Sequence, residues 1–340
     1  LVARQLGADV TLVSAGQIGG SAVLTDCVPS KTLIATSEAI DQAAASGYLG
    51  VRIDGRPADR SAFSVDLATV NERILELAHA QSAGIRQHLE QAGVEIVHGR
   101  GTLTSEATVE VTNDDPSWEI TADTILLATG ARPRVLADAV PDGERILSWE
   151  QIYQLDELPE HLIVVGSGVT GAEFASAFHA LGSTVTLVSS RDRVLPGEDV
   201  DAAGVLEDVF TRRGLNVRSR SRAVAARRVD NSVIVTLDDS STLQGSHLLM
   251  AVGSLPNTDD LGLETAGVST DSRGFITVDR VSRTSARHIY AAGDCTGVNM
   301  LASVAAMQGR IAMYHALGDA VAPLESTAIS STIFTEPEIA

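Results

Sequence analysis

The chain has 340 residues, of which 44% are hydrophobic, and its formal net charge at pH 7 is −19. Its length allows two domains with well-buried cores, whereas so acidic a chain lacks the basic surface that nucleic-acid binding needs. No apolar run approaches a membrane span, the first residues do not read as a signal peptide, and two cysteines are too few for a disulfide framework. We therefore predict a globular cytoplasmic protein with no integral membrane segment and no metal site.

An internal repeat organises the chain. Residues 5–14, QLGADVTLVS, return near the middle as residues 180–189, ALGSTVTLVS. The second copy follows a predicted strand, a glycine-rich turn and a helix, which together open a βαβ nucleotide-binding unit. The turn of the first copy should then lie upstream of Leu1, so we expect the chain to be a fragment. Residues 327–340 start a new element and stop, which predicts truncation at that end as well.

Residues 19–34, GGSAVLTDCVPSKTLI, read as a glycine-containing loop that opens a helix at Cys27. Pro29 falls in the first helical turn, where its missing N–H costs nothing, and a thiol at a helix N-terminus is biased toward thiolate. Lys31 is the only lysine among 25 lysine and arginine residues, which favours a chemical role that arginine cannot fill. A lone cysteine could equally be an inert core residue, but its neighbours favour a functional loop.

The turn between residues 166 and 171, GSGVTG, follows the apolar strand LIVVG and precedes an amphipathic helix. Glycines in this context let the backbone approach a pyrophosphate, which the helix N-terminus stabilises. The alternative, a merely tight strand–helix turn, is disfavoured by that context. We predict a dinucleotide site at Gly166, Gly168 and Gly171.

Ser189 ends the next strand, where an NAD-preferring site usually places an acid for the ribose 2′-hydroxyl. Without that carboxylate, a 2′-phosphate meets no repulsion, and the nearby Arg191 and Arg193 can pair with it. This predicts that NADPH is at least tolerated. The alternative is that both arginines are solvated surface residues.

In three further segments, a predicted apolar strand is followed directly by residues typical of turns. Residues 124–133, TILLATGARP, resemble residues 248–257, LLMAVGSLPN, and each closes with glycine and proline. In residues 288–297, HIYAAGDCTG, the strand delivers Asp294, whose carboxylate can hydrogen-bond a sugar or ribityl hydroxyl. Alone, that Gly-Asp pair could be an ordinary turn. Cys295 is expected to be a small buried residue.

Together, GG…CVPSKTLI, ATGARP, VVGSGVTGAE, GSLPN, IYAAGDC and LASVAAMQGR resemble the flavoprotein disulfide reductases in the order of their motifs over the whole chain. The sequence is most similar to the actinobacterial dihydrolipoamide-dehydrogenase-like NAD(P)H:quinone reductases, whose loop lacks its first cysteine. The resemblance implies an α/β fold with two doubly wound Rossmann-like domains, the second inserted in the first. It implies FAD on residues 1–152 and 284–322 and NAD(P)H on residues 153–283. Residues 323–340 would begin an α+β domain that forms a homodimer.

The same resemblance implies roles for individual residues. Cys27 would stack near the flavin, Lys31 would lie beside flavin N5, and Glu173 would be the ion-pair partner of the lysine, which makes these three the expected catalytic residues. Asp294 would hold the ribityl chain, Leu301 and Ala302 would start a helix that faces the pyrimidine edge, and Gly101 would contact adenine. The remaining cofactor contacts are expected at Gly19, Gly20, Lys31, Thr129, Gly130, Gly166, Gly168, Gly171, Ser189, Arg191, Gly253 and Gly293.

Two departures from the family pattern matter for function. Ala22 stands five residues before Cys27, in place of the thiol that attacks an external disulfide, so dithiol–disulfide exchange cannot run through this loop. Ser14 stands where the first βαβ unit would place its ribose acid, which would weaken FAD retention.

These features predict an FAD-dependent oxidoreductase that takes hydride from NAD(P)H and passes electrons to a quinone without a redox disulfide. One alternative is a transhydrogenase that moves hydride between the two nicotinamide pools. Another is a degenerate relative that holds nucleotide without turnover, which the serine at position 14 keeps open.

Overall fold

The structure is a computed structural model that describes residues 1–340, and it divides into two compact units. The first unit comprises Leu1–Leu24, His79–Arg132 and Ser254–Ser331, and the second comprises Thr25–Ala78, Pro133–Gly253 and Thr332–Ala340. No helix combines the length and the apolar character that crossing a bilayer would require.

The elements of the first unit are short strands with few helices. Its helices are α1 (Val2–Gln5), α2 (Gly20–Leu24) and α7 (Ala302–Ala316), with 3₁₀ turns at Asp294–Thr296 and Ser326–Ala328. Its strands are β1 (Thr11–Ser14), β4 (Glu95–His98), β5 (Arg100–Leu103), β6 (Thr108–Thr112), β7 (Trp118–Thr121), β8 (Ile125–Leu127), β18 (Ser254–Pro256) and β19 (Ile289–Ala291). Helix α4 (Leu67–Gln91) and strand β9 (Ala131–Pro133) contribute residues to both units.

The second unit holds the larger sheet. Its helices are α3 (Cys27–Ala45), α5 (Val169–Leu181) and α6 (Val200–Arg213), with 3₁₀ turns at Ser46–Leu49, Arg60–Ala62 and Ile152–Gln154. Its strands are β2 (Arg52–Ile53), β3 (Arg56–Pro57), β10 (Ile146–Ser148), β11 (His161–Val165), β12 (Thr184–Val188), β13 (Asn216–Arg218), β14 (Ala223–Val229), β15 (Ser232–Leu237), β16 (Thr242–Gly245) and β17 (His247–Met250).

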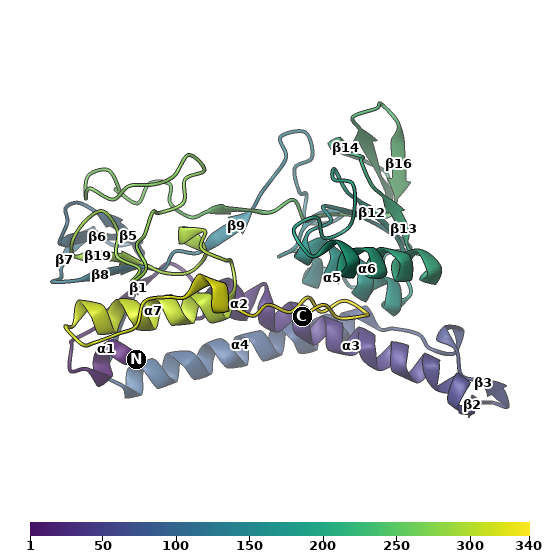
Figure 1. The fold of residues 1–340 in the computed structure, drawn as a ribbon, viewed down its shortest axis with the longest axis horizontal. Helices are drawn as coiled ribbons and strands as arrows, with labels where there is room; N and C mark the ends of the chain where they lie inside the picture. Colours follow the sequence, from purple (N-terminus) through teal and green to yellow (C-terminus); the bar gives the residue numbers. More distant parts are fainter. The chain divides into compact units, whose positions relative to one another are not determined.

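A parallel five-stranded sheet in the order β10-β17-β11-β12-β13 forms the centre of the second unit. Successive side chains of a strand point to opposite faces, and both faces are covered here. Leu162 and Val164 pack with helices α3, α5 and α6, whereas Ile163 and Val165 pack with the antiparallel sheet β14-β15-β16. Figure 1 shows α5 and α6 below the sheet and β14 and β16 above it.

The first unit contains two parallel strand pairs, β1 with β4 and β8 with β19, and the antiparallel sheet β5-β6-β7. Parallel pairing requires crossover connections, which the chain supplies through long excursions between the paired strands. Helix α7 packs beside β19, and the hydroxyl of Tyr290 on that strand lies 2.8 Å from Nδ1 of His315 on the helix.

The predicted fold class is confirmed: the protein is α/β, with parallel strands linked by helices and one part of the chain inserted in another. The predicted domain boundaries remain a prediction. The compact units have other boundaries than the predicted domains, because residues 25–78 pack with the sheet that carries the GSGVTG turn. Leu33 of α3 and Leu67 of α4 belong to that core.

His247 on β17 makes the stability of this sheet sensitive to acid. Burial, with the adjacent Arg145 guanidinium, lowers the pKa of His247 to about 4, and Asp142 offsets this only partly. The unfolded state therefore binds a proton more readily, and stability present above pH 6.5 is lost as the pH falls toward 4. After allowance for solvent screening, urea titrations should show the free energy of unfolding falling by about 2 kcal/mol over this range. A His247→Gln variant should lack that component, and an unchanged slope in it would contradict the assignment.

Candidate functional site

The glycine-rich turn joins β11 to α5, as the sequence predicted. A Cβ at Gly166 would overlap the carbonyl oxygen of Ala251, and a Cβ at Gly171 would overlap the carbonyl oxygen of Gly166. A Cβ at Gly168 would meet nothing within 4 Å. Two of the glycines therefore serve close packing, and the third leaves open space at the N-terminus of α5, where a pyrophosphate fits the exposed amides.

The loop after β12 begins at Ser189, whose side chain is fully buried. Its hydroxyl accepts hydrogen bonds from the Ser167 hydroxyl (2.6 Å) and the Arg191 N–H (3.1 Å), and it donates to the Arg193 carbonyl (3.2 Å). All of its hydrogen-bonding capacity is used within the chain. Ser189 therefore ties the loop to the glycine-rich turn, and Arg191, which is exposed, is the side chain that can reach a ligand.

Helix α3 begins at Cys27, as predicted, and presents Lys31 one turn later. The Lys31 ammonium donates a hydrogen bond to Glu173 Oε2 at 2.8 Å and lies 3.3 Å from the Ser30 hydroxyl. Glu173 comes from α5, and its side chain is only 6% exposed, whereas that of Lys31 is 36% exposed. The predicted ion pair is therefore present, with its carboxylate buried and its ammonium reaching the surface.

Tyr153 lies beside this pair and was not anticipated from the sequence. Its ring centroid is 6.0 Å from that of Phe174 on α5. Burial raises the pKa of the Tyr153 hydroxyl well above its usual range, and the negative charges of Asp26 and Glu173 act in the same direction. The phenol is therefore kept neutral next to the carboxylate that holds Lys31.

The first unit gathers the residues expected to contact FAD. Thr129 and Gly130 follow β8, and both of their carbonyls accept hydrogen bonds from Asn257, at 3.0 and 2.9 Å. Gly293 and Asp294 follow β19, the strand paired with β8. The other expected contacts in this unit are Gly19, Gly20, Gly101, Leu301 and Ala302, and the last two open α7.

The Asp294 carboxylate gives a direct test of fit to a sugar alcohol. It is half-buried, burial raises its pKa, and no donor of the chain bonds to it. Leu301 caps α7 without a side-chain hydrogen bond, so the first amides of that helix also lack a capping partner. An acceptor for hydroxyls and an open helix N-terminus suit a flavin nucleotide, so these residues fit FAD.

The second unit holds the other expected site residues: Cys27, Lys31, Gly166, Gly168, Gly171, Glu173, Ser189, Arg191 and Gly253. Gly253 follows β17 with φ +92°, and its carbonyl accepts a hydrogen bond from the Arg134 N–H at 2.9 Å. No disulfide joins the two cysteines of the chain. Cys295 is buried beside the Ala292 carbonyl, as expected for a structural residue.

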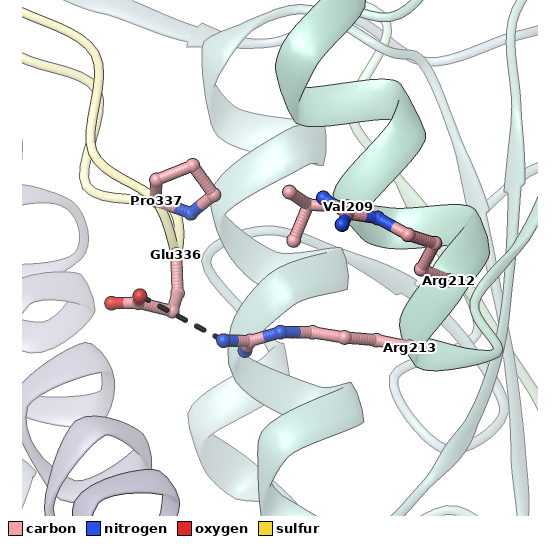
Figure 2. A pocket seen from close by; sticks show the side chains of 5 residues that line it. All are labelled: Val209, Arg212, Arg213, Glu336 and Pro337. Atoms are coloured by element: carbon pink, nitrogen blue, oxygen red, sulfur yellow. Dashed lines mark ion pairs between the residues drawn. The ribbon is translucent and has the colours of Figure 1, made fainter.

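One pocket of the second unit is lined by none of these residues. Val209, Arg212 and Arg213 of α6 line it with Glu336 and Pro337, and its volume is about 420 Å³ (Figure 2). Arg213 bridges two carboxylates there, at 2.7 Å from Asp41 and 3.7 Å from Glu336. The guanidinium is thus neutralised by the protein, and the pocket has no glycine-rich backbone to receive a nucleotide.

Known proteins of one family match almost the whole chain. The family model described as pyridine nucleotide-disulphide oxidoreductase matches residues 1–309. An NAD(P)H dehydrogenase (quinone) of Mycobacterium tuberculosis is 51% identical over 338 residues, covering 97% of this chain and 68% of that protein. A dihydrolipoyl dehydrogenase of Chlamydia pneumoniae is 35% identical, covering 100% of this chain and 71% of that protein. The crystal structure of LpdA from Mycobacterium tuberculosis superposes with a TM-score of 0.92 at 47% identity, covering 99% and 74% of the two chains.

The chain belongs to the pyridine nucleotide-disulphide oxidoreductase family, which confirms the resemblance drawn from its motifs. Sequence reasoning missed Tyr153, Ser167 and Phe334. Ser167 lies inside the GSGVTG motif, so its place in the turn could be predicted, but its hydrogen bond to Ser189 could not. Tyr153 and Phe334 stand in no motif. Only the folded chain brings Tyr153 beside Phe174 of α5 and the Phe334 N–H to Glu173.

Proposed function

We propose that this protein is an FAD-dependent oxidoreductase that oxidises NAD(P)H and reduces a quinone without a redox disulfide. One observation carries the proposal: α3 presents Lys31 on a buried Glu173, while Ala22 stands where disulfide exchange needs a thiol. The charged machinery of the family is thus retained and its thiol relay is not. The M. tuberculosis relative at 51% identity is named for the same two reactants.

FAD, when bound, would accept hydride from the nicotinamide and pass electrons to the acceptor. The chain's own residues would bind the two nucleotides and orient them. Gly168 leaves room for the nicotinamide dinucleotide's pyrophosphate, and Asp294 accepts hydrogen bonds from sugar hydroxyls. Lys31 supplies a fixed positive charge where negative charge develops, and a preorganised charge of this kind lowers a barrier without reorganisation. Cys27 lies one helical turn before Lys31 on α3 and is not a nucleophile in the proposed reaction.

The test uses the full-length protein loaded with FAD. We expect rapid oxidation of NADPH or NADH with menadione and none with lipoamide. Turnover with lipoamide would refute the proposal, because it would require a second thiol near Cys27. Rapid exchange between NADPH and an NAD analogue without quinone would instead support a transhydrogenase. A colourless full-length preparation would support a non-catalytic relative. Cytoplasmic location and a homodimer remain part of the proposal.

Arg191 provides a prediction about cofactor choice. It is exposed, follows the buried Ser189, and lies on the loop that the Ser167–Ser189 hydrogen bond holds against the glycine-rich turn. If it pairs with the 2′-phosphate, Arg191→Ala should raise KM for NADPH about tenfold, the equivalent of about 1.4 kcal/mol, and leave KM for NADH unchanged. Arg212→Ala, on α6 beside the pocket, is the matched control. Equal effects on the two nucleotides would show that Arg191 does not read the phosphate.

A further inference from the structure

The last residues of the second unit cross the helices that carry the ion pair. Residues 332–340, here named the C-terminal strap, are anchored in the core by Ile333, which is 3% exposed. Paired backbone hydrogen bonds of 2.7 and 3.1 Å between Ile333 and Ile339 close the strap on itself. The Glu336 N–H donates to the Ser176 hydroxyl of α5 at 3.2 Å, and its carboxylate faces Arg213, as Figure 2 shows.

Phe334 of the strap makes two separate contacts with the ion pair. Its backbone N–H donates a hydrogen bond to Glu173 Oε1 at 2.9 Å, and Lys31 bonds the other oxygen, Oε2, at 2.8 Å. The two carboxylate oxygens are therefore assigned to different donors. Because the Glu173 side chain is buried, the strap amide fixes its rotation as well as satisfying an acceptor.

The ring of Phe334 supports the ammonium directly. Its centroid lies 5.0 Å from Lys31 Nζ, within the range of a cation–π contact. Lys31 is thus held by a carboxylate and by an aromatic face, in addition to the Ser30 hydroxyl at 3.3 Å. The Phe334 N–H orients the carboxylate and the Phe334 ring is the aromatic face, so both contacts with Lys31 depend on Phe334.

We propose that Phe334 is a positioning residue for the reaction, which it serves by holding the Lys31–Glu173 pair in place from the C-terminal strap. The inference rests on the proposed role of Lys31. The strap amide sets the orientation of the carboxylate, and the ring sets the position of the ammonium. A strap that shifts along α5 would therefore move the charge of Lys31.

The experiment compares Phe334→Leu, Phe334→Tyr and the strap control Glu336→Gln in the FAD-loaded full-length protein labelled with [ε-¹³C]lysine. The Lys31 resonance is identified by its loss in Lys31→Met. We expect Phe334→Leu to move this resonance toward the position of free lysine, because the ring current is lost, and to slow anaerobic flavin reduction by NADPH about three- to tenfold. Phe334→Tyr and Glu336→Gln should stay close to the wild type in both measurements.

A second comparison separates positioning from a general effect on folding. In a Lys31→Met background, Phe334→Leu should slow flavin reduction no further, since the charge it positions is gone. An undiminished loss in that background, or an unmoved lysine resonance in the single variant, would overturn the inference. Neither measurement uses an acceptor. Failure of menadione reduction alongside the expected lysine shift would therefore count against the proposed function and not against the role of Phe334.

Discussion

Replacing Lys31 with methionine is expected to lower kcat for menadione reduction by NADPH about 100-fold. Methionine keeps the length and most of the packing of lysine but removes the charge that Glu173 holds at 2.8 Å. Loss of one preorganised electrostatic group at a reacting centre costs a factor of this order. Stopped-flow absorbance of the flavin under anaerobic conditions separates flavin reduction from the later transfer, and steady-state turnover measures both.

Lys31→Arg is the informative companion. Arginine keeps the positive charge but spreads it over a planar group that cannot occupy the position of a compact ammonium. We expect an intermediate rate, because Glu173 can still pair with it while the contact with Phe334 is altered. Thermal unfolding of each variant separates a loss of chemistry from a loss of stability, because Lys31→Met leaves the Glu173 carboxylate, only 6% exposed, without its ammonium partner. Wild-type turnover in Lys31→Met would remove lysine from the mechanism.

Gly168→Val is expected to raise KM for NADPH about 100-fold, or roughly 2.7 kcal/mol, while the protein folds normally. The backbone at Gly168 is extended, with φ −71° and ψ −174°, so an L-residue fits there without strain. A Cβ would meet no atom of the chain within 4 Å, and the added methyls would occupy the space left for a pyrophosphate. Reduction of the bound flavin by dithionite, which needs no nucleotide site, should be unaffected.

Gly171→Ala is the matched control, and the opposite outcome is expected. Its Cβ would overlap the carbonyl oxygen of Gly166, so α5 would have to move away from the sheet. The free energy of unfolding should fall by about 3 kcal/mol, as measured by urea titration. If both variants instead unfolded alike, or if Gly168→Val bound NADPH normally, the open space at Gly168 would not be the nucleotide site.

Local sequence was sufficient for features whose cause is local. The GSGVTG turn, the start of α3 at Cys27 and the short strand before Asp294 are all where the motifs predicted them. Each depends on backbone freedom, a missing N–H or an apolar run within a few residues, so neighbouring residues decide it. Ala22 is of the same kind, because the absence of a thiol needs no structure to be read.

The boundaries of the compact units and the contacts of Phe334 with Lys31 and Glu173 could not be predicted from local sequence. Residues 25–78 join the sheet of the second unit through core contacts of Leu33 and Leu67, which look like ordinary apolar positions in sequence. Ser189 was expected at the nucleotide, yet its hydroxyl is satisfied by Ser167 and Arg193, and a buried hydroxyl takes whichever partners folding brings to it.

The sequence by itself therefore determined the family, the α/β fold class and the pairing of a lysine with a one-cysteine loop, because motif spacing and residue identity carry that information. The family resemblance named Glu173 as the partner of Lys31, but the contacts of Phe334 with both residues came from the tertiary structure alone. Glu173 lies 142 positions from Lys31, and Phe334 lies 161 positions from Glu173. Contacts at such separations are set by the packing of α3, α5 and the C-terminal strap, for which no local pattern exists.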